Sequence, residues 1–111
     1  MMSKDQIKWF ENELKNATDY KMLVWVTSKP FNGIAKEVKS GEDRNSWPEF
    51  YSNRKVIANL IAKYKVDNLV AISGDAHSLA IDDGTHNDFS DDGGWGFPVF
   101  QAAPLSRSGS V

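Results

Sequence analysis

Apolar residues recur every three or four positions in two stretches of the chain, which is the spacing of one face of an α-helix. In the first stretch Ile7, Phe10 and Leu14 alternate with charged residues, and this predicts a helix over about residues 4–16. The second stretch predicts a helix over 48–64. Both stretches open on the pattern of a capping box, which is Ser3-Lys4-Asp5-Gln6 in the first and Ser46-Trp47-Pro48-Glu49 in the second.

Four shorter apolar runs have the composition of β-strands. The runs over 22–27 and 66–73 are almost continuously apolar, which is typical of strands that are covered on both faces. Two later runs, 79–81 and 97–101, have the length of strands in a short hairpin. They flank an acidic, glycine-rich loop over 82–96.

The predicted order of elements is helix, strand, helix, strand and then a short antiparallel hairpin. This order is typical of an α/β structure with at least two parallel strands. The length of 111 residues suits a single domain over 1–111. The rest is expected to be irregular, with a loop over 32–47 that has room for one helical turn at 34–39, and a poorly ordered tail over 106–111.

Composition and charge narrow the classes of function. The chain has no cysteine, which excludes disulfides and thiolate metal sites. No apolar run approaches the roughly 18 residues of a membrane span, and no secretory signal peptide is expected in this chain. A net charge of −2 lacks the basic excess of a nucleic-acid-binding domain. Residues 66–111 carry one Arg against 7 Asp, so this half would bind phosphate only through a cation.

Polar residues follow the two predicted parallel strands, at the edge of the sheet where α/β proteins bind ligands. Ser28 and Lys29 follow the first strand, and Asp75 and His77 follow the second. A carboxylate and an imidazole at this spacing could converge on one zinc, iron or manganese ion. The alternative is a tight turn that leaves His77 on the surface, and a metal site would need further ligands from elsewhere.

The acidic loop is a second candidate for metal binding. Its segment 82–88, which contains His86, could hold calcium through several oxygens, but it lacks the ligand order of an EF-hand. A solvated acidic loop is the alternative. The segment Gly93-Gly94-Trp95-Gly96 has no following Lys and Ser or Thr and opens no helix. It is therefore expected to be a flexible lid or a turn, and not a phosphate-binding loop.

Five further side chains carry expectations. Core positions are expected for three tryptophans, which are Trp9, Trp25 and Trp47, whereas Trp95 is a candidate for a substrate or interface contact. Arg54 lies at the edge of the apolar stripe of the second helix. It either extends along the surface or turns its guanidinium inward against a carboxylate such as Asp43.

Several segments together resemble the C-terminal part of the PhoD-like metallophosphatases, also called the alkaline phosphatase D family, within the calcineurin-like metallophosphoesterase class. Residues 6–14 are similar to the family's Q-x-x-W-(L/F)-x-x-x-L helix. Trp47, Phe50 and Arg54 are similar to its D-x-W-x-x-(Y/F)-x-x-x-R pattern. Residues 69–77 end in Gly-Asp-Ala-His, similar to its G-D-(V/A)-H motif. One such motif is weak, but several in the family's order are specific.

The resemblance implies a four-layer αββα fold with a multi-metal site that hydrolyses phosphate mono- or diesters. Asp75 and His77 would be metal ligands, for iron with calcium or for zinc or manganese. Ser28, Arg54 and Trp47 would support the site or the structure around it. The chain departs from the wider class at two points: Asp75 stands where that class often has a histidine, and Ser28-Lys29-Pro30 stands where it often has His-x-Pro.

The metal motifs of the family's N-terminal half do not occur in these residues. One hypothesis is that the chain is a C-terminal fragment of a metal-dependent phosphatase, inactive on its own and binding a cation at most weakly, through Asp75 and His77. The alternative is a non-catalytic α/β module that forms homo-oligomers. Neither hypothesis involves a nucleic acid or a membrane span. The family is often exported, whereas this chain carries no signal peptide, so the sequence assigns no compartment.

Overall fold

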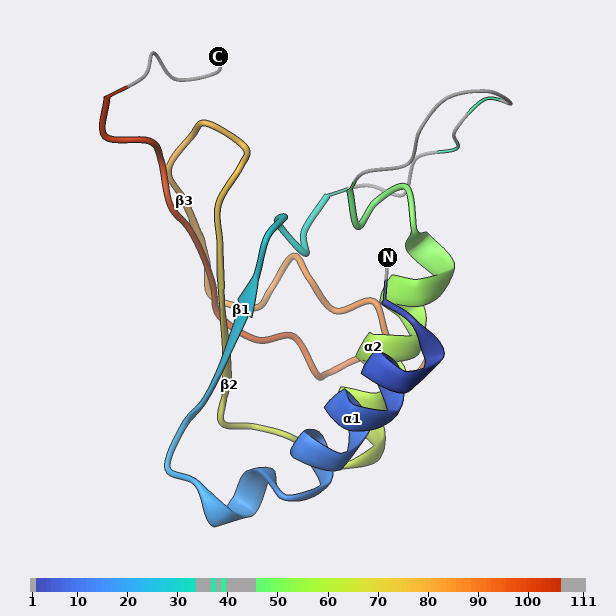
Figure 1. The fold of residues 1–111 in the computed structure, drawn as a ribbon. Coiled ribbons are helices and arrows are strands. Elements are labelled where there is room, and N and C mark those ends of the chain that lie inside the picture. The colour runs from blue at the N-terminus through green and yellow to red at the C-terminus, as the bar shows by residue number, and fades with distance from the viewer. Residues whose placement is uncertain (1, 34–36, 38, 40–45, 107–111) are drawn as a thin grey trace.

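The computed structural model describes residues 2–33, 37, 39 and 46–106. Along the described chain the elements are α1 (Lys4–Lys15), the short 3-10 helix η1 (Ala17–Asp19), β1 (Leu23–Thr27), α2 (Tyr51–Lys63), β2 (Leu69–Ser73), β3 (Ala80–Asp82) and β4 (Val99–Gln101). This order confirms the predicted α/β class (Figure 1). Asp43 and the tail beyond Ser106 lie outside the described residues. Most of the turn that was expected at 34–39 also lies outside them.

Local hydrogen bonds fix where the helices begin and end. The capping box of α1 is complete: Gln6 N donates to Ser3 Oγ at 3.1 Å, and Ser3 N donates to Gln6 Oε1 at 2.8 Å. Before α2, Ser46 N donates to Glu49 Oε2 at 3.0 Å, but residues 47–50 form turns. The helix therefore begins at Tyr51, three residues later than predicted.

The C-terminal end of α2 has the hydrogen bonds of a Schellman motif. Lys65 N donates to Ala62 O and Val66 N donates to Ile61 O, both at 3.1 Å. Lys65 takes the left-handed conformation, with a φ of 51°, that glycine more often takes at this position. Val66 and Ile61 are both buried, so the turn leads the chain directly into the core before β2 begins.

The four described strands form one mixed sheet in the order β1-β2-β4-β3. β1 and β2 are parallel, as predicted, with Leu23 opposite Leu69 and Thr27 opposite Ser73. β3 and β4 are antiparallel, which confirms the hairpin pairing. The sequence did not predict that β4 also pairs with β2, in parallel. The carboxyl ends of β1, β2 and β4 therefore meet at one edge of the sheet.

Both helices cover the same face of the sheet, and the core lies between them and the strands (Figure 1). Its buried members are Phe10, Leu14, Ala17, Trp25, Phe31, Trp47, Ile57, Ile61, Val66, Leu69, Ala71, Phe97 and Val99. Trp25 and Trp47 lie in this core as predicted. The prediction for Trp9 is wrong, because α1 turns Phe10 inward and leaves Trp9 61% exposed.

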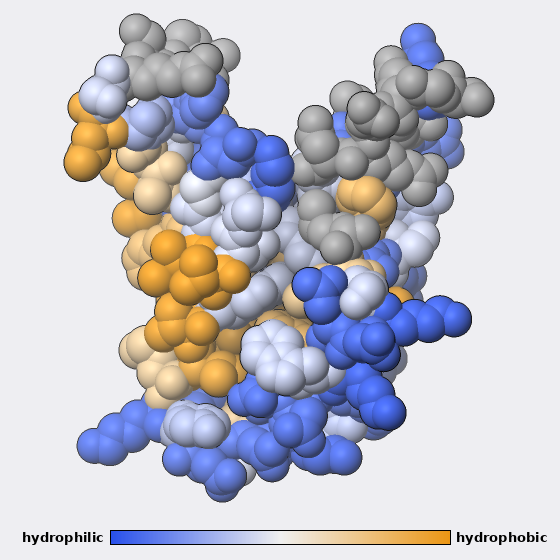
Figure 2. Space-filling model, in the orientation of Figure 1, coloured by the Kyte–Doolittle hydropathy of each residue, from blue (hydrophilic) through white to orange (hydrophobic). Residues whose placement is uncertain are grey.

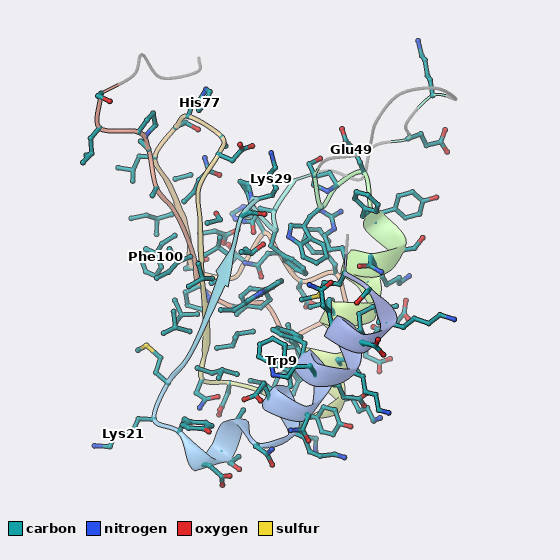
Figure 3. The ribbon with its side chains drawn as sticks, in the orientation of Figure 1. Trp9, Lys21, Lys29, Glu49, His77 and Phe100 are labelled. Carbon is teal, nitrogen blue, oxygen red and sulfur yellow. The ribbon has the colours of Figure 1, made fainter. Side chains whose placement is uncertain are left out.

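The opposite face of the sheet is apolar and is covered by no described segment; we call it the open face. Register partners Val26, Ile72, Phe100 and Ile81 form one row across the four described strands. Their exposed fractions are 75%, 41%, 43% and 69%. Figure 2 shows apolar side chains on this side of the molecule, and in Figure 3 Phe100 points away from the helices.

The open face corrects one prediction. The apolar runs over 22–27 and 66–73 were expected to form strands buried on both faces, and this is wrong for the chain as described. One set of alternate residues, such as Trp25 and Ala71, packs under the helices, while the other set faces outward. Within the described residues, no helix has the length and apolar character that crossing a membrane requires.

Candidate functional site

The parallel register of β1 and β2 brings Lys29 and Asp75 together. Thr27 lies opposite Ser73 at the last paired position, and Lys29 and Asp75 each follow two residues later. Lys29 Nζ lies 2.5 Å from Asp75 Oδ2, an ion pair between side chains that are 27% and 54% exposed. Figure 3 shows Lys29 and His77 at the same end of the sheet. The site therefore joins the loop after the first strand to the loop after the second.

The backbone of the 74–77 loop is tightly folded. Ala76 N donates to Gly74 O at 2.9 Å, and Asp75 between them has a φ of 70°. A three-residue turn with a positive central φ is rare and strained. His77 also has a positive φ, 56°. For residues other than glycine this conformation costs about 1 kcal/mol. The two predicted metal ligands thus both occupy strained backbone positions, as residues of functional sites often do.

Charge around Asp75 favours its ionised form. The hydrogen bond from Lys29 holds the pKa of the Asp75 carboxyl below its usual range, although desolvation acts in the opposite direction. The charges of Lys29 and His77 lower the pKa of Asp75 further. The carboxylate is therefore available as a metal ligand at neutral pH, and no proton has to leave it when an ion binds.

The donor set of Asp75 and His77 suits a metal such as zinc, iron or manganese, because it pairs a carboxylate with an imidazole. The set is incomplete, however: among the described residues, no three His, Cys, Asp or Glu side chains lie together so that they could hold one ion. A metal site usually needs three or four protein ligands. Ser28 is exposed at the end of β1. Asp75 and His77 are thus fewer ligands than a metal ion usually requires from a protein.

Trp47 supports the loop that carries Lys29. Its Nε1 donates to Thr27 Oγ1 at 3.1 Å, and Thr27 Oγ1 donates to the Lys29 carbonyl oxygen at 3.2 Å. Trp47 is itself buried, with its ring 5.4 Å from that of Phe31. The hydrogen bonds therefore hold the backbone of Lys29 to a rigid part of the core.

Arg54 holds the next segment of the same loop. It is 3% exposed, and its Nη1 donates to the carbonyl oxygens of Gly33 at 2.6 Å and Phe31 at 3.3 Å. Its guanidinium carbon lies 3.7 Å from the centre of the Phe89 ring. Burial lowers the pKa of Arg54. The inward orientation of Arg54 was one of the two predicted; the groups that it binds are carbonyl oxygens, and Asp43 lies outside the described residues.

The acidic loop over 82–96 uses its polar side chains to bind its own backbone. Asp82 Oδ1 accepts from Gly84 N at 2.8 Å, and Asp83 Oδ1 accepts from Thr85 N at 3.1 Å. The side chain of His86 is 83% exposed. These Asx turns explain the aspartates without an ion, so the solvated loop is the better of the two readings of this segment.

Three further sets of contacts join the two ends of this loop and bind it to Phe97, which lies two residues before β4. The buried Asn87 side chain donates to Phe97 O at 2.5 Å and accepts from Phe97 N at 2.9 Å. Gly84 and Gly96 pass so closely that a Cβ on Gly96 would lie 1.8 Å from Gly84 O. Asp88 accepts from the N–H groups of Gly94 and Trp95. Asp88 therefore holds the backbone of Gly94 and Trp95 in place, and Trp95 packs partly buried against the core.

Two residues of this region were missed by sequence reasoning. Lys29 was noted beside Ser28, but its pairing with Asp75 depends on the register of two strands that are 46 positions apart. The sequence does contain a signal for this pairing, because each residue lies two positions after the end of its strand. Asn87 carried no signal of its own, since an asparagine in an acidic, glycine-rich loop is ordinary.

The fold and the site define a mixed α/β protein whose polar residues gather at the carboxyl ends of parallel strands, where catalytic and ligand-binding groups of such proteins lie. The sequence profile of the PhoD-like phosphatases matches residues 1–110. The chain belongs to the PhoD-like phosphatase family. This confirms the resemblance that the motifs indicated.

A solved structure titled "Structure of PhoD" has a similar fold. The TM-score is 0.69 over 94% of this chain, with 18% sequence identity. The match covers 20% of the PhoD chain, so the present chain spans about a fifth of that protein's length. Among curated protein sequences, none matches this chain.

Proposed function

We propose that this chain contributes part of the active site of a metal-dependent phosphatase that hydrolyses phosphate mono- or diesters, with Asp75 and His77 as metal ligands. The observation that carries the proposal is the position of the Gly-Asp-Ala-His loop, directly beyond the carboxyl end of β2 in a chain of the PhoD-like family. A metal bound there would polarise the phosphate ester and activate water for attack. Iron with calcium, or zinc or manganese, would suit these ligands.

Neighbouring residues of the chain hold the two proposed ligands in place. Asp75 is held ionised beside Lys29, and the turn at Gly74–Ala76 fixes its backbone. The imidazole of His77 would bind in its neutral form, so protons would compete with the metal. Trp47 and Arg54 hold the loop between β1 and α2, and Ser28 lies at its start. These contacts keep the two strand-end loops in place around the ligands.

The ligand assignment is tested by titration with Zn²⁺, observed through the histidine NMR signals. We expect His77 to shift and the exposed His86 to serve as an internal control that shifts little. Asp75→Asn should weaken the response of His77, because the carboxylate is one of two ligands. If His86 shifts and His77 does not, or if Asp75→Asn leaves the titration unchanged, the assignment is wrong and the acidic loop collects ions nonspecifically.

Because the described residues hold only two of the ligands, we propose that the remaining ligands come from polypeptide beyond this chain. The chain alone should hydrolyse p-nitrophenyl phosphate and bis-p-nitrophenyl phosphate no faster than buffer, with Zn²⁺, Mn²⁺, Fe³⁺ or Ca²⁺ present. Metal-dependent turnover that His77→Ala abolishes would show instead that this chain completes a site by itself.

The open face supports a place in a four-layer αββα fold. Its row of Val26, Ile72, Phe100 and Ile81 has the regular apolar side chains that sheet-on-sheet packing requires. The match to PhoD covers only a fifth of that chain, which leaves ample polypeptide for a second sheet. We therefore propose that a second sheet, with its own helices outside, covers this face in the assembled phosphatase.

The alternative, a non-catalytic module that self-associates, would use the same face, although family membership does not favour it. Exposed apolar side chains on a sheet associate readily in water, and a second copy of the chain offers an identical face. In this alternative the homo-oligomer is the functional form, and Asp75 and His77 are structural. The metal titration above distinguishes the two candidates, because only the phosphatase requires His77 to bind metal.

A further inference from the structure

Lys29 places a positive charge directly against the carboxylate of Asp75. Its Nζ lies 2.5 Å from Asp75 Oδ2, so the ammonium covers one of the oxygens through which Asp75 would bind a metal ion. Lys29 belongs to the basic part of the chain, residues 1–65, and Asp75 belongs to the acidic part. This ion pair thus joins the basic part to the acidic part at the strand ends.

Resting on the proposed function, we propose that Lys29 is an internal counter-ion that a metal ion must displace from Asp75, so that Lys29 sets the metal affinity of this site. An ammonium and a metal ion cannot both occupy the same carboxylate lone pairs, because their charges repel at such short distances. Binding therefore includes the loss of the Lys29 ion pair. The affinity that remains is the difference between the two interactions.

The structure holds Lys29 in place for this role. Its carbonyl oxygen accepts from Thr27 Oγ1, which is bonded in turn to the buried Trp47. Two residues beyond, Phe31 is fully buried, so the backbone is fixed on both sides of Lys29. The side chain of Lys29 is only 27% exposed, against 55% for Lys55 in its pair with Asp91 on the surface. The ammonium of Lys29 is therefore directed at Asp75 before any ion arrives.

The experiment compares Zn²⁺ affinities from the His77 signal in four proteins: the natural chain, Lys29→Gln, Lys29→Arg and Lys55→Gln. Lys29→Gln should bind Zn²⁺ about three- to tenfold more tightly, since both the competing ion pair and a nearby positive charge are gone. Lys29→Arg keeps the charge and should bind no more tightly than the natural chain. Lys55→Gln removes the same charge from a different ion pair, that with Asp91 at 2.6 Å, and should change the affinity less than twofold.

Each outcome decides the proposal. Equal affinities of the natural chain and Lys29→Gln would overturn it while leaving the ligand assignment intact. An equal gain in Lys55→Gln would show that net charge, and not the pairing with Asp75, sets the affinity. If His77 responds to Zn²⁺ in none of the four proteins, the ligand assignment fails and this inference fails with it. Lys29→Met, which keeps an unbranched side chain but removes the charge, replaces Lys29→Gln if the latter does not fold.

Discussion

At the scale of a single residue, Asp75 makes two opposing contributions to stability, one through its backbone and one through its side chain. Its backbone lies in the strained left-handed region, and its carboxylate is paired with Lys29. The strain raises the free energy of the folded state, while the ion pair lowers it. Because the ion pair depends on charge, the balance between the two depends on pH.

We predict that the pKa of the Asp75 carboxyl lies below the ordinary aspartate value of about 3.9 and rises toward it in Lys29→Gln. The folded pKa is lowered, so the stabilisation is fully present above the unfolded value. It is lost as the pH falls from about 4 through the lowered pKa. Carbon-detected NMR titration of the carboxyl groups measures this directly.

The control for this titration is Lys55→Gln. That substitution should raise the pKa of Asp91, which Lys55 lowers through its hydrogen bond, and leave that of Asp75 unchanged. A pKa of Asp75 that is the same in the natural chain and in Lys29→Gln would contradict the ion pair in solution.

At this scale the sequence predicted well where the chemistry is local. Asp75 and His77 were placed beyond a strand end because their spacing and the preceding apolar run are visible in the sequence. The pairing of Asp75 with Lys29 was not predicted, since it depends on strand register. The burial of Trp9 was wrongly predicted because Trp9 and Phe10 are adjacent and apolar, and only packing decides which of them the helix turns inward.

At the scale of elements, the side chain of Asn87 binds the loop over 82–96 to Phe97, two residues before β4. The Asn87 amide pairs with both backbone groups of Phe97, in the way that a neighbouring strand would, and Asn87 is 1% exposed. Phe97 is also buried, so water cannot replace these hydrogen bonds. The loop is thus an ordered connection that sets where β4 enters the sheet.

We predict that Asn87→Ala lowers the free energy of unfolding by about 2–4 kcal/mol, because it leaves two buried backbone groups of Phe97 without partners. Urea unfolding followed by tryptophan fluorescence measures the change. Asn59→Ala is the matched control. Asn59 bonds the exposed Asp91, so its loss should cost less than about 1 kcal/mol. Similar costs for the two variants would contradict the role of Asn87.

The helices and the first two strands were predictable because periodicity and capping signals are local. The position of β4 was not, because its pairing with β2 brings together strands that are separated by a long loop. The late start of α2 was also missed: Ser46 and Glu49 make one of the two capping hydrogen bonds, but Phe50, with a φ of −101° and a ψ of 42°, interrupts the helix.

At the scale of the whole molecule, the main feature is the exposed apolar surface of the open face. An apolar row that crosses four strands without cover is unusual for a protein in water, since such rows normally lie inside. The sequence could not reveal this, because a run of apolar residues looks the same whether the chain itself or another polypeptide covers its second face.

We predict that the chain self-associates at micromolar concentration when no other polypeptide covers the open face, as measured by light scattering after gel filtration. Val26→Lys should shift the protein toward the monomer, because it places a charge at the most exposed position of the apolar row, on the edge strand β1. Val56→Lys, at an exposed valine on α2, should leave the mass unchanged. A natural chain that is monomeric throughout, with a cooperative thermal transition, would contradict this prediction.

The turn after β2 has a consequence for laboratory evolution. Asp75 and His77 both lie at positive φ, where glycine would be more relaxed by up to about 1 kcal/mol at each position. A screen that rewards only heat resistance would therefore favour glycine at the two positions that we assign to metal. Variants enriched by such a screen would be more stable and would lack the two side chains that we propose as metal ligands. Libraries built on this scaffold should keep positions 75 and 77 fixed.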